Sequence, residues 1–319
     1  MKDEAKGKMI DILLATYNGE KFIKELLDSL LRQKCKEDFC IRIRDDGSKD
    51  TTCKILREYE NQYPEKIFVE ENPIPTGSAK CNFFKLLEDA KGDYVMFCDQ
   101  DDIWEEHKVQ ITIDAMKKQE KENGIHPILV CTDLKIINEK KEILSSSFRT
   151  YMNLEKDGKL RRLILQNNVT GCTMMVNQPL LNLMKRQVKV EHILMHDHYA
   201  AILALMLGKI VYLDEAPILY RQHADNSVGA KDAKSISYLF GRWKRGKKQY
   251  QKDLFASARQ VKEILRCFSN EKMDENSRKL LEEYAKIEKM GKLQRICFYL
   301  KYKVFKYGWI RCVMGFVWG

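Results

Sequence analysis

Short apolar runs alternate with amphipathic stretches in the first part of the chain. Runs rich in β-branched and aromatic residues that end in polar loops are typical of buried strands, whereas apolar residues recurring at helical spacing are typical of helices. The pattern predicts strands over residues 9–15, 40–44, 67–69 and 94–98, with helices over 21–33, 51–63, 82–90 and 108–123. This alternation predicts an α/β fold: a mainly parallel sheet with helices on both faces.

The pattern becomes less regular in the middle of the chain and changes again near residue 229. Residues 128–131, 173–176 and 210–213 have strand character, and 197–207 has the pattern of a strongly apolar helix. Beyond Gly229 the chain shows basic helical stretches without a strand signal. We therefore expect an α/β domain over residues 1–230 and a C-terminal helical region over residues 231–319.

Composition and cysteine spacing indicate the cellular compartment of the protein. The chain has 319 residues, 44% hydrophobic content and a net charge of +10, with the basic excess concentrated after about residue 235. Its ten cysteines show no CxxC spacing, and the first residues, Met1-Lys2-Asp3-Glu4, are polar rather than a signal peptide. These features, and the lack of an apolar run of about 18 residues, predict a cytoplasmic protein with reduced thiols.

Three carboxylates, Asp99, Asp101 and Asp102, follow directly after the predicted strand over 94–98. Clustered carboxylates repel one another, and a hard divalent cation such as Mn²⁺ or Mg²⁺ offsets that repulsion and typically bridges protein oxygens to phosphates. The alternative is a solvated acidic turn, or a cap on the helix that follows. The position behind a buried strand favours the metal site, because open α/β folds bind ligands at this edge of the sheet.

Two further loops end predicted strands. One contains Thr16, Tyr17 and Asn18, and the other contains Asp45 and Asp46 before a glycine. If their strands run parallel to the one before Asp99, all three loops share one edge and could clamp a nucleotide. Either loop taken alone is a plain turn with capping residues.

With these motifs the chain resembles the family-2 glycosyltransferases, which have the GT-A fold and move a sugar from a nucleotide-diphosphate donor. The resemblance covers residues 9 to 229. It rests on six motifs in a fixed order along the chain: Ala15-Thr16-Tyr17-Asn18-Gly19, Arg44-Asp45-Asp46-Gly47-Ser48, Cys98-Asp99-Gln100-Asp101-Asp102-Ile103-Trp104, Val169-Thr170-Gly171-Cys172, His196-Asp197 and Tyr220-Arg221-Gln222-His223. The DQDDIW form of the third motif and the YRQH form of the last further resemble bacterial rhamnosyltransferases.

The resemblance implies a donor-binding role for the first three loops. Thr16 and Tyr17 would contact a uracil or thymine ring, with Asn18 in the same loop. Asp45 or Asp46 would bond the base. Asp99 would reach both the ribose and the metal.

The resemblance also implies the residues around the reacting sugar. Asp101 and His223 would complete the metal site with Asp99. Gly171 would lie against the donor sugar and acceptor. Asp197 occupies the place of the family's catalytic base, in a pair that usually reads Glu-Asp and here reads His196-Asp197.

The C-terminal region carries a separate signal. Residues 292–318 interleave aromatic residues, among them Phe298, Tyr299 and Tyr307, with Lys and Arg. Basic, aromatic amphipathic helices lie in anionic membrane interfaces. The alternative is a helical appendage whose rings pack as core on the catalytic domain. Aromatic and basic residues also suit nucleic acid, but no nucleic-acid module signature is present.

The resemblance, together with the basic C-terminal region, therefore implies an inverting, metal-dependent glycosyltransferase at the inner face of the cell membrane. Its donor would be dTDP-rhamnose or a UDP-sugar, and its acceptor a lipid-linked glycan in O-antigen or capsule synthesis. One rival is a sugar-nucleotide nucleotidyltransferase, which needs a basic, Gly-rich loop after the first strand. Here Gly19 is the loop's one glycine, and Lys21 is its first cation. The other rival is a non-catalytic membrane scaffold on the same fold, which the presence of Asp101 and Asp197 disfavours.

Overall fold

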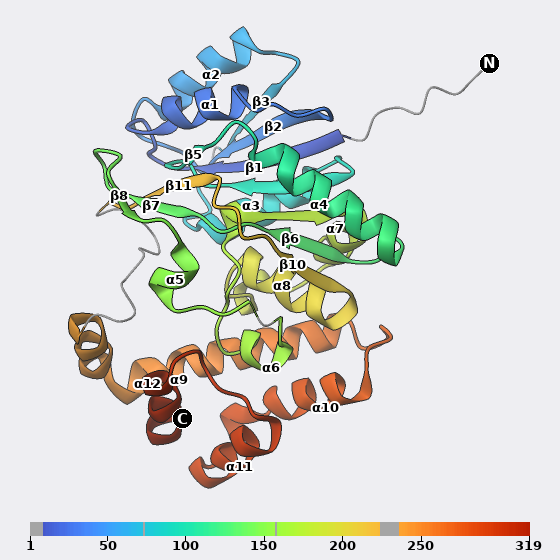
Figure 1. Ribbon diagram of the computed structural model, residues 1–319, viewed down its shortest axis with the longest axis vertical. Helices are drawn as coiled ribbons and strands as arrows, with labels where there is room; N and C mark the ends of the chain where they lie inside the picture. The colour runs from blue at the N-terminus through green and yellow to red at the C-terminus, as the bar shows by residue number, and fades with distance from the viewer. Residues whose placement is uncertain (1–8, 73, 157, 224–235) are drawn as a thin grey trace.

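A central sheet of seven strands organises the molecule, in the order β10-β6-β9-β4-β1-β2-β3 (Figure 1). A computed structural model describes residues 9–72, 74–156, 158–223 and 236–319 of the chain. The strands are β1 (Met9–Thr16), β2 (Asp38–Asp45), β3 (Ile67–Glu71), β4 (Tyr94–Cys98), β6 (Ile128–Cys131), β9 (Met174–Asn177) and β10 (Lys209–Tyr212). β9 runs antiparallel to both of its neighbours, and the other pairs are parallel. The predicted mainly parallel α/β sheet is confirmed.

Helices follow the strands. They are α1 (Ile23–Leu31), α2 (Thr52–Gln62), α3 (Ala79–Asp89), α4 (Lys108–Asn123), α5 (Phe148–Met152), α6 (Leu160–Leu163), α7 (Gln178–Met184) and α8 (His196–Leu207). The apolar pattern predicts those over 23–31, 52–62, 79–89, 108–123 and 196–207, but not the three short α-helices between residues 148 and 184. In α1, Ile23, Leu26, Leu27 and Leu30 are buried, so its apolar stripe faces the sheet. These helices are short, and such packing supplies most of their stability.

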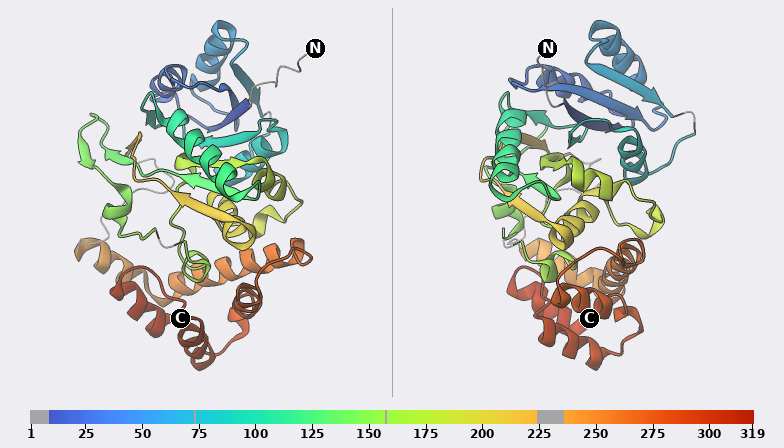
Figure 2. Two further views of the ribbon diagram at one scale, coloured as in Figure 1. Left: turned by 45° about the vertical axis from the view of Figure 1, so that its right-hand side comes forward. Right: turned by 90° about the vertical axis from the view of Figure 1, so that its right-hand side faces the viewer.

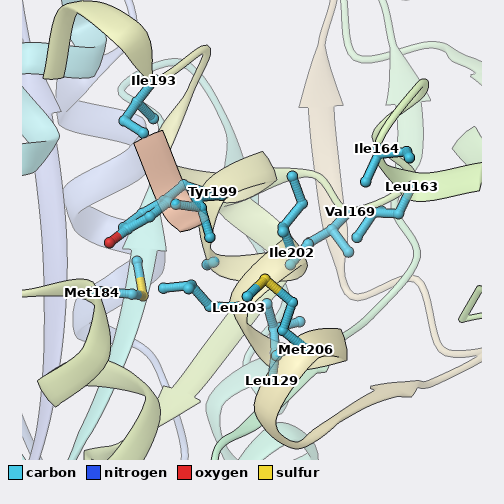
Figure 3. Close-up of a cluster of buried hydrophobic side chains, with 14 of the residues drawn as sticks. Leu129, Leu163, Ile164, Val169, Met184, Ile193, Tyr199, Ile202, Leu203 and Met206 are labelled. Atoms are coloured by element: carbon cyan, nitrogen blue, oxygen red, sulfur yellow. The ribbon is translucent and has the colours of Figure 1, made fainter. Parts of the chain in front are cut away.

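Alternation along β1 divides the core into two layers. Ile12 and Leu14 face the layer beneath α1 and α4, whereas Leu13 faces the layer that contains α8. Successive side chains of a strand point to opposite faces of a sheet, so β1 contributes to both layers. Figure 3 shows the second layer, in which Tyr199 and Ile202 of α8 lie in a cluster with Leu129 of β6.

The C-terminal helices extend the second layer. They are α9 (Ile236–Cys267), α10 (Glu275–Tyr284), α11 (Lys292–Tyr302) and α12 (Trp309–Trp318), and they lie beyond α8 in each view (Figures 1 and 2). Leu254, Tyr284 and Phe298 belong to the same buried cluster as the side chains of α8. The predicted boundary between residues 230 and 231 lies outside the described residues.

Three of the rings that were expected at a membrane interface are core residues. Phe298, Tyr299 and Tyr307 are each no more than 3% exposed. Of the two alternatives for these rings, the structure therefore shows the packed one. Within the described residues no helix combines the length and the apolarity needed to cross a bilayer.

A second, four-stranded sheet has the order β5-β11-β7-β8. Its strands are β5 (Ile103–Trp104), β11 (Ile218–Arg221), β7 (Lys135–Ile137) and β8 (Ile143–Ser145). β5 follows the carboxylate cluster directly, and β11 pairs with β5. The small sheet therefore places residues near position 221 beside the loop after β4.

Candidate active site

Three strand ends meet at one edge of the central sheet. β1 runs parallel to both β2 and β4, with Thr16 opposite Asp45. The Gln100 side chain joins two of the loops: its Oε1 accepts from the Tyr17 N–H at 2.9 Å and its Nε2 donates to the Tyr17 carbonyl at 3.0 Å. The shared edge that the motifs predicted is confirmed.

Asp45 and Asp46 stabilise the loops at this edge by accepting hydrogen bonds from them. The Asp45 carboxylate accepts from the Thr16 hydroxyl at 2.8 Å, from the Gly47 and Ser48 N–H groups and from the Ser48 hydroxyl. Asp46 accepts from the side chain of Asn72, the N–H and hydroxyl of Thr76 and the N–H of Gly77. Burial alone would raise the pKa of Asp46, but these hydrogen bonds lower it below the ordinary value. Both carboxyl groups are thus already engaged by protein donors.

Tyr17 and Asn18 form the exposed part of the first loop. The Tyr17 side chain is 51% exposed, unusual for a ring of its size. Asn18 takes a positive φ of 48°, and its Oδ1 accepts from the Lys49 N–H at 2.8 Å. The Asn18 N–H donates to the Ser48 hydroxyl, also at 2.8 Å. The loop after β2 therefore fixes the backbone that carries the open Tyr17 ring.

Asp101 and His223 lie in contact although they are far apart in sequence. His223 Nε2 is 2.8 Å from Asp101 Oδ2, and both side chains are nearly buried. Arg221, 1% exposed, donates from Nε to the Asp101 carbonyl at 3.1 Å and pairs with Glu25 of α1. The Phe22 ring lies 5.0 Å from the His223 ring and 4.6 Å from the Arg221 guanidinium. Residues from α1, β11 and the loop after β4 thus form one connected group.

Asp99 and Asp102 extend this group inward. Asp102 is fully buried, and its carboxylate oxygens have no hydrogen-bond partner among the described residues. Burial, Asp101 and Asp197 raise the pKa of Asp99 to about 7. Burial, Asp101 and Asp99 raise that of Asp102 well above its ordinary value. Burial and mutual repulsion thus both oppose ionisation of Asp99 and Asp102.

The carboxylates suit a hard divalent cation, although the cluster seen among the described residues joins Asp99 to Asp102 rather than to the predicted ligands Asp101 and His223. Ligand atoms of Asp99, Asp102 and Cys172 lie within 4.8 Å of one another. Carboxylate oxygens suit Mg²⁺ and Mn²⁺, whereas a thiol suits softer metals, so Cys172 is not an expected ligand. Lys108, a buried lysine near Asp102, does not substitute for the ion. Its Nζ lies 3.5 Å over the Trp104 ring without a hydrogen bond among the described residues, and burial lowers its pKa to about 7.

Asp197 and Gly171 meet next to this group. Asp197 lies in the first turn of α8 and accepts from the His198 N–H at 2.5 Å. A Cβ atom placed on Gly171 would lie 3.8 Å from Asp197 Cβ and 2.8 Å from His196 Nε2. Burial raises the pKa of Asp197 to about 6, although hydrogen bonds from His198 and Gly171 oppose that shift. A carboxylate with this pKa is ionised at neutral pH and can still accept a proton.

Sequence reasoning did not assign every residue that shapes this site. Gln100 and Arg221 lie inside quoted motifs but received no role, and Glu25 was read only as a position on an amphipathic helix. An arginine directly after the apolar run over 218–220 was the one available signal, because a buried cation needs a partner. Asp102 was counted in the carboxylate cluster, but Asp101 and not Asp102 was given as a metal ligand.

Known proteins match this chain in sequence. Residues 11–182 match the family model described as Glycosyl transferase family 2. The dTDP-rhamnosyl transferase RfbG of Shigella flexneri is 29% identical over 234 residues, which is 70% of this chain and 76% of that protein. The poly(ribitol-phosphate) beta-glucosyltransferase of Bacillus spizizenii is 38% identical over 94 residues, which is 29% of this chain and 15% of that protein.

A solved structure matches the fold. S. aureus TarS residues 1–349, in complex with UDP, has a TM-score of 0.52 and 18% sequence identity. The match covers 92% of this chain and 87% of that one, so it includes the C-terminal helical region. From the family match over residues 11–182 and this fold, the chain belongs to glycosyl transferase family 2 and is a glycosyltransferase with the GT-A fold.

Proposed function

We propose that this enzyme is an inverting, metal-dependent glycosyltransferase that moves a sugar from a nucleotide-diphosphate donor to a glycan acceptor of a cell-surface polysaccharide. dTDP-rhamnose and UDP-sugars are the proposed donors, because a dTDP-rhamnosyl transferase and a UDP-bound structure are among the matches. The observation that carries the proposal is the shared edge of the β1, β2 and β4 loops, next to which Asp197 and Gly171 meet.

The donor would lie along this edge. Tyr17 is the exposed ring available to stack on the base, and Thr16 and Asn18 form the rest of that loop. Asp45 and Asp46 support the base pocket, chiefly by fixing the loops that form it. Asp99, at the end of β4, would face the ribose and the metal.

Asp99, Asp101 and His223 would hold Mn²⁺ or Mg²⁺. The ion would offset charge on the diphosphate as it leaves. Arg221 positions the pair Asp101–His223 by holding the Asp101 backbone.

Asp197 would act as the general base. An acceptor hydroxyl attacks the anomeric carbon while the bond from that carbon to the diphosphate breaks, and the hydroxyl proton passes to Asp197. A single displacement from the opposite face inverts the anomeric configuration. The position of Asp197 beside Gly171 supports this role, since Gly171 keeps the space beside it free of a side chain.

We expect the full chain to hydrolyse at least one dTDP- or UDP-sugar slowly in Mn²⁺, because water can replace a missing acceptor. A panel of nucleotide sugars, assayed for nucleotide-diphosphate release, would identify the donor. A parallel assay with nucleoside triphosphate and sugar phosphate tests the nucleotidyltransferase alternative. Pyrophosphate release in that assay, without hydrolysis of any nucleotide sugar, would show that the enzyme is a nucleotidyltransferase. No product in either assay would favour the non-catalytic scaffold.

The acceptor is proposed to be lipid-linked, with the enzyme peripheral at the inner membrane face. Leu293 and Leu300 of α11 are 78% and 58% exposed, and Cys297 between them is exposed on the same helical face. Residues 285–319 contain eight Lys or Arg and one acidic residue. The exposed leucines of α11, rather than the buried rings, are thus the proposed contact with an anionic bilayer.

We expect the full chain to sediment at low salt with vesicles of phosphatidylcholine and phosphatidylglycerol, and the double variant Leu293→Ser, Leu300→Ser to bind on the order of 10²-fold more weakly. Each leucine moved out of water contributes roughly 1.5–3 kcal/mol, and two together account for that factor. Ile125→Ser is the matched control, since Ile125 is 77% exposed but follows α4. Equal sedimentation of the double variant and the full chain would exclude this face.

A further inference from the structure

His196, the first residue of α8, is buried with only 3% exposed, and its ring nitrogens make no hydrogen bond to the described residues. Its ring stacks on Phe97 of β4, with centroids 4.8 Å apart and planes at 28°, and lies 4.1 Å from the Phe83 ring of α3. The two phenylalanines fix the plane of the imidazole but satisfy neither nitrogen.

Buried polar atoms in native proteins are nearly always hydrogen-bonded, so an unpaired imidazole calls for a partner that this structure does not contain. The ring turns its Nε2 toward Gly171, on the side where Asp197 lies. His196 Nε2 is 2.8 Å from the point that a Cβ on Gly171 would occupy, and Asp197 Cβ is 3.8 Å from the same point. The imidazole nitrogen and the proposed base therefore lie on the same side of Gly171, and the missing side chain of Gly171 is what lets the imidazole approach its backbone this closely.

We propose that His196 binds a hydroxyl of the acceptor sugar, beside the hydroxyl from which Asp197 takes the proton. This proposal rests on the proposed function. A neutral imidazole offers one donor and one acceptor, and a sugar hydroxyl can match either nitrogen. Burial lowers the pKa of His196 to about 3, so the ring is neutral at working pH and does not compete with Asp197 for the proton.

The variant His196→Phe tests this, because phenylalanine keeps the ring stack and removes both nitrogens. The full chain and the variant would be compared in thermal midpoint, in nucleotide-sugar hydrolysis and in transfer to a panel of octyl glycosides. We expect kcat/KM for the glycoside to fall by about tenfold to a hundredfold, as for a lost hydrogen bond to buried groups. Hydrolysis should stay within about twofold, because water lacks the second hydroxyl. His196→Gln, which restores an amide, should recover part of the transfer.

A second measurement does not depend on the variant folding. In the full chain labelled with ¹⁵N-histidine, the His196 ring nitrogens should shift when the octyl glycoside is added. Wild-type transfer by His196→Phe, an equal loss of transfer and hydrolysis, or no shift on glycoside addition would each make His196 a packing residue and overturn the proposal. A wild-type chain that hydrolyses no nucleotide sugar would instead overturn the proposed function, and this proposal with it.

Discussion

The variant Asp197→Asn should keep nucleotide-diphosphate binding and lose sugar transfer. Asparagine has nearly the shape of aspartate, and its Oδ1 can still accept from the His198 N–H, so the first turn of α8 is retained. The amide cannot accept the proton of the attacking hydroxyl, and loss of a general base costs a factor on the order of 10²–10⁴ in turnover. Calorimetric titration with UDP or dTDP in Mn²⁺, beside the transfer rate, separates the two effects.

The pH dependence of transfer gives a second readout of the same group. Burial raises the pKa of Asp197 to about 6, and the base works only when ionised. Transfer by the wild-type chain should therefore fall as the pH decreases through about 6, and the remaining activity of Asp197→Asn should lack this limb. If nucleotide binding collapses together with transfer, Asp197 is a structural residue and the base assignment is wrong.

Most of the central sheet could be predicted because its inner strands are buried along most or all of their length. All five residues of β4 are buried, and the apolar run over 94–98 signals this directly. The helices α1 to α4 could be predicted from their apolar stripes and α8 from its continuous apolar run, whereas the short helices α5, α6 and α7 were not predicted. The small sheet could not, because β5 has two residues and β7 and β8 three each. Runs this short carry no periodicity.

The three loops at the sheet edge could be predicted, whereas the residues that join them could not. Parallel strands bring their carboxyl ends to one edge, so the places of Thr16, Asp45 and Asp99 follow from the order of elements. The contact of Arg221 with Glu25 joins residues 196 positions apart and depends on where β11 lies. The order of elements does not predict that position. Gln100 bridges two loops through hydrogen bonds to the Tyr17 backbone, and no pattern in a single sequence predicts such bonds.

The C-terminal rings show how one pattern can have two meanings. Aromatic residues at helical spacing beside cations suit a membrane surface or a helix packed on a protein, and burial against a distant partner decides between them. In this chain Tyr284 and Phe298 share a buried cluster with α8, so the rings stabilise the fold. Leu293 and Leu300 differ in that they remain exposed.

Asp101→Ala should abolish activity in the same way as metal removal. Asp101 contacts His223 and adds to the charge around Asp99, so its loss removes a proposed ligand and releases His223. Charge stabilisation by a metal ion is worth several kcal/mol, so turnover should fall by about 10³-fold or more. Asp114→Ala, an exposed aspartate on α4, is the matched control and should retain wild-type turnover. Wild-type turnover by Asp101→Ala, or full activity in excess chelator, would contradict the metal site.

The most direct test of the site is a calorimetric titration of the full chain with UDP and with dTDP, in Mn²⁺ and again in excess EDTA. It requires neither the donor sugar nor the acceptor to be known. The edge formed by Thr16, Asp45 and Asp99 predicts that at least one of the two nucleotides binds at one site per chain in Mn²⁺, and that EDTA or Asp101→Ala abolishes this binding. Equal affinity in EDTA, or no binding of either nucleotide in Mn²⁺, would contradict the account.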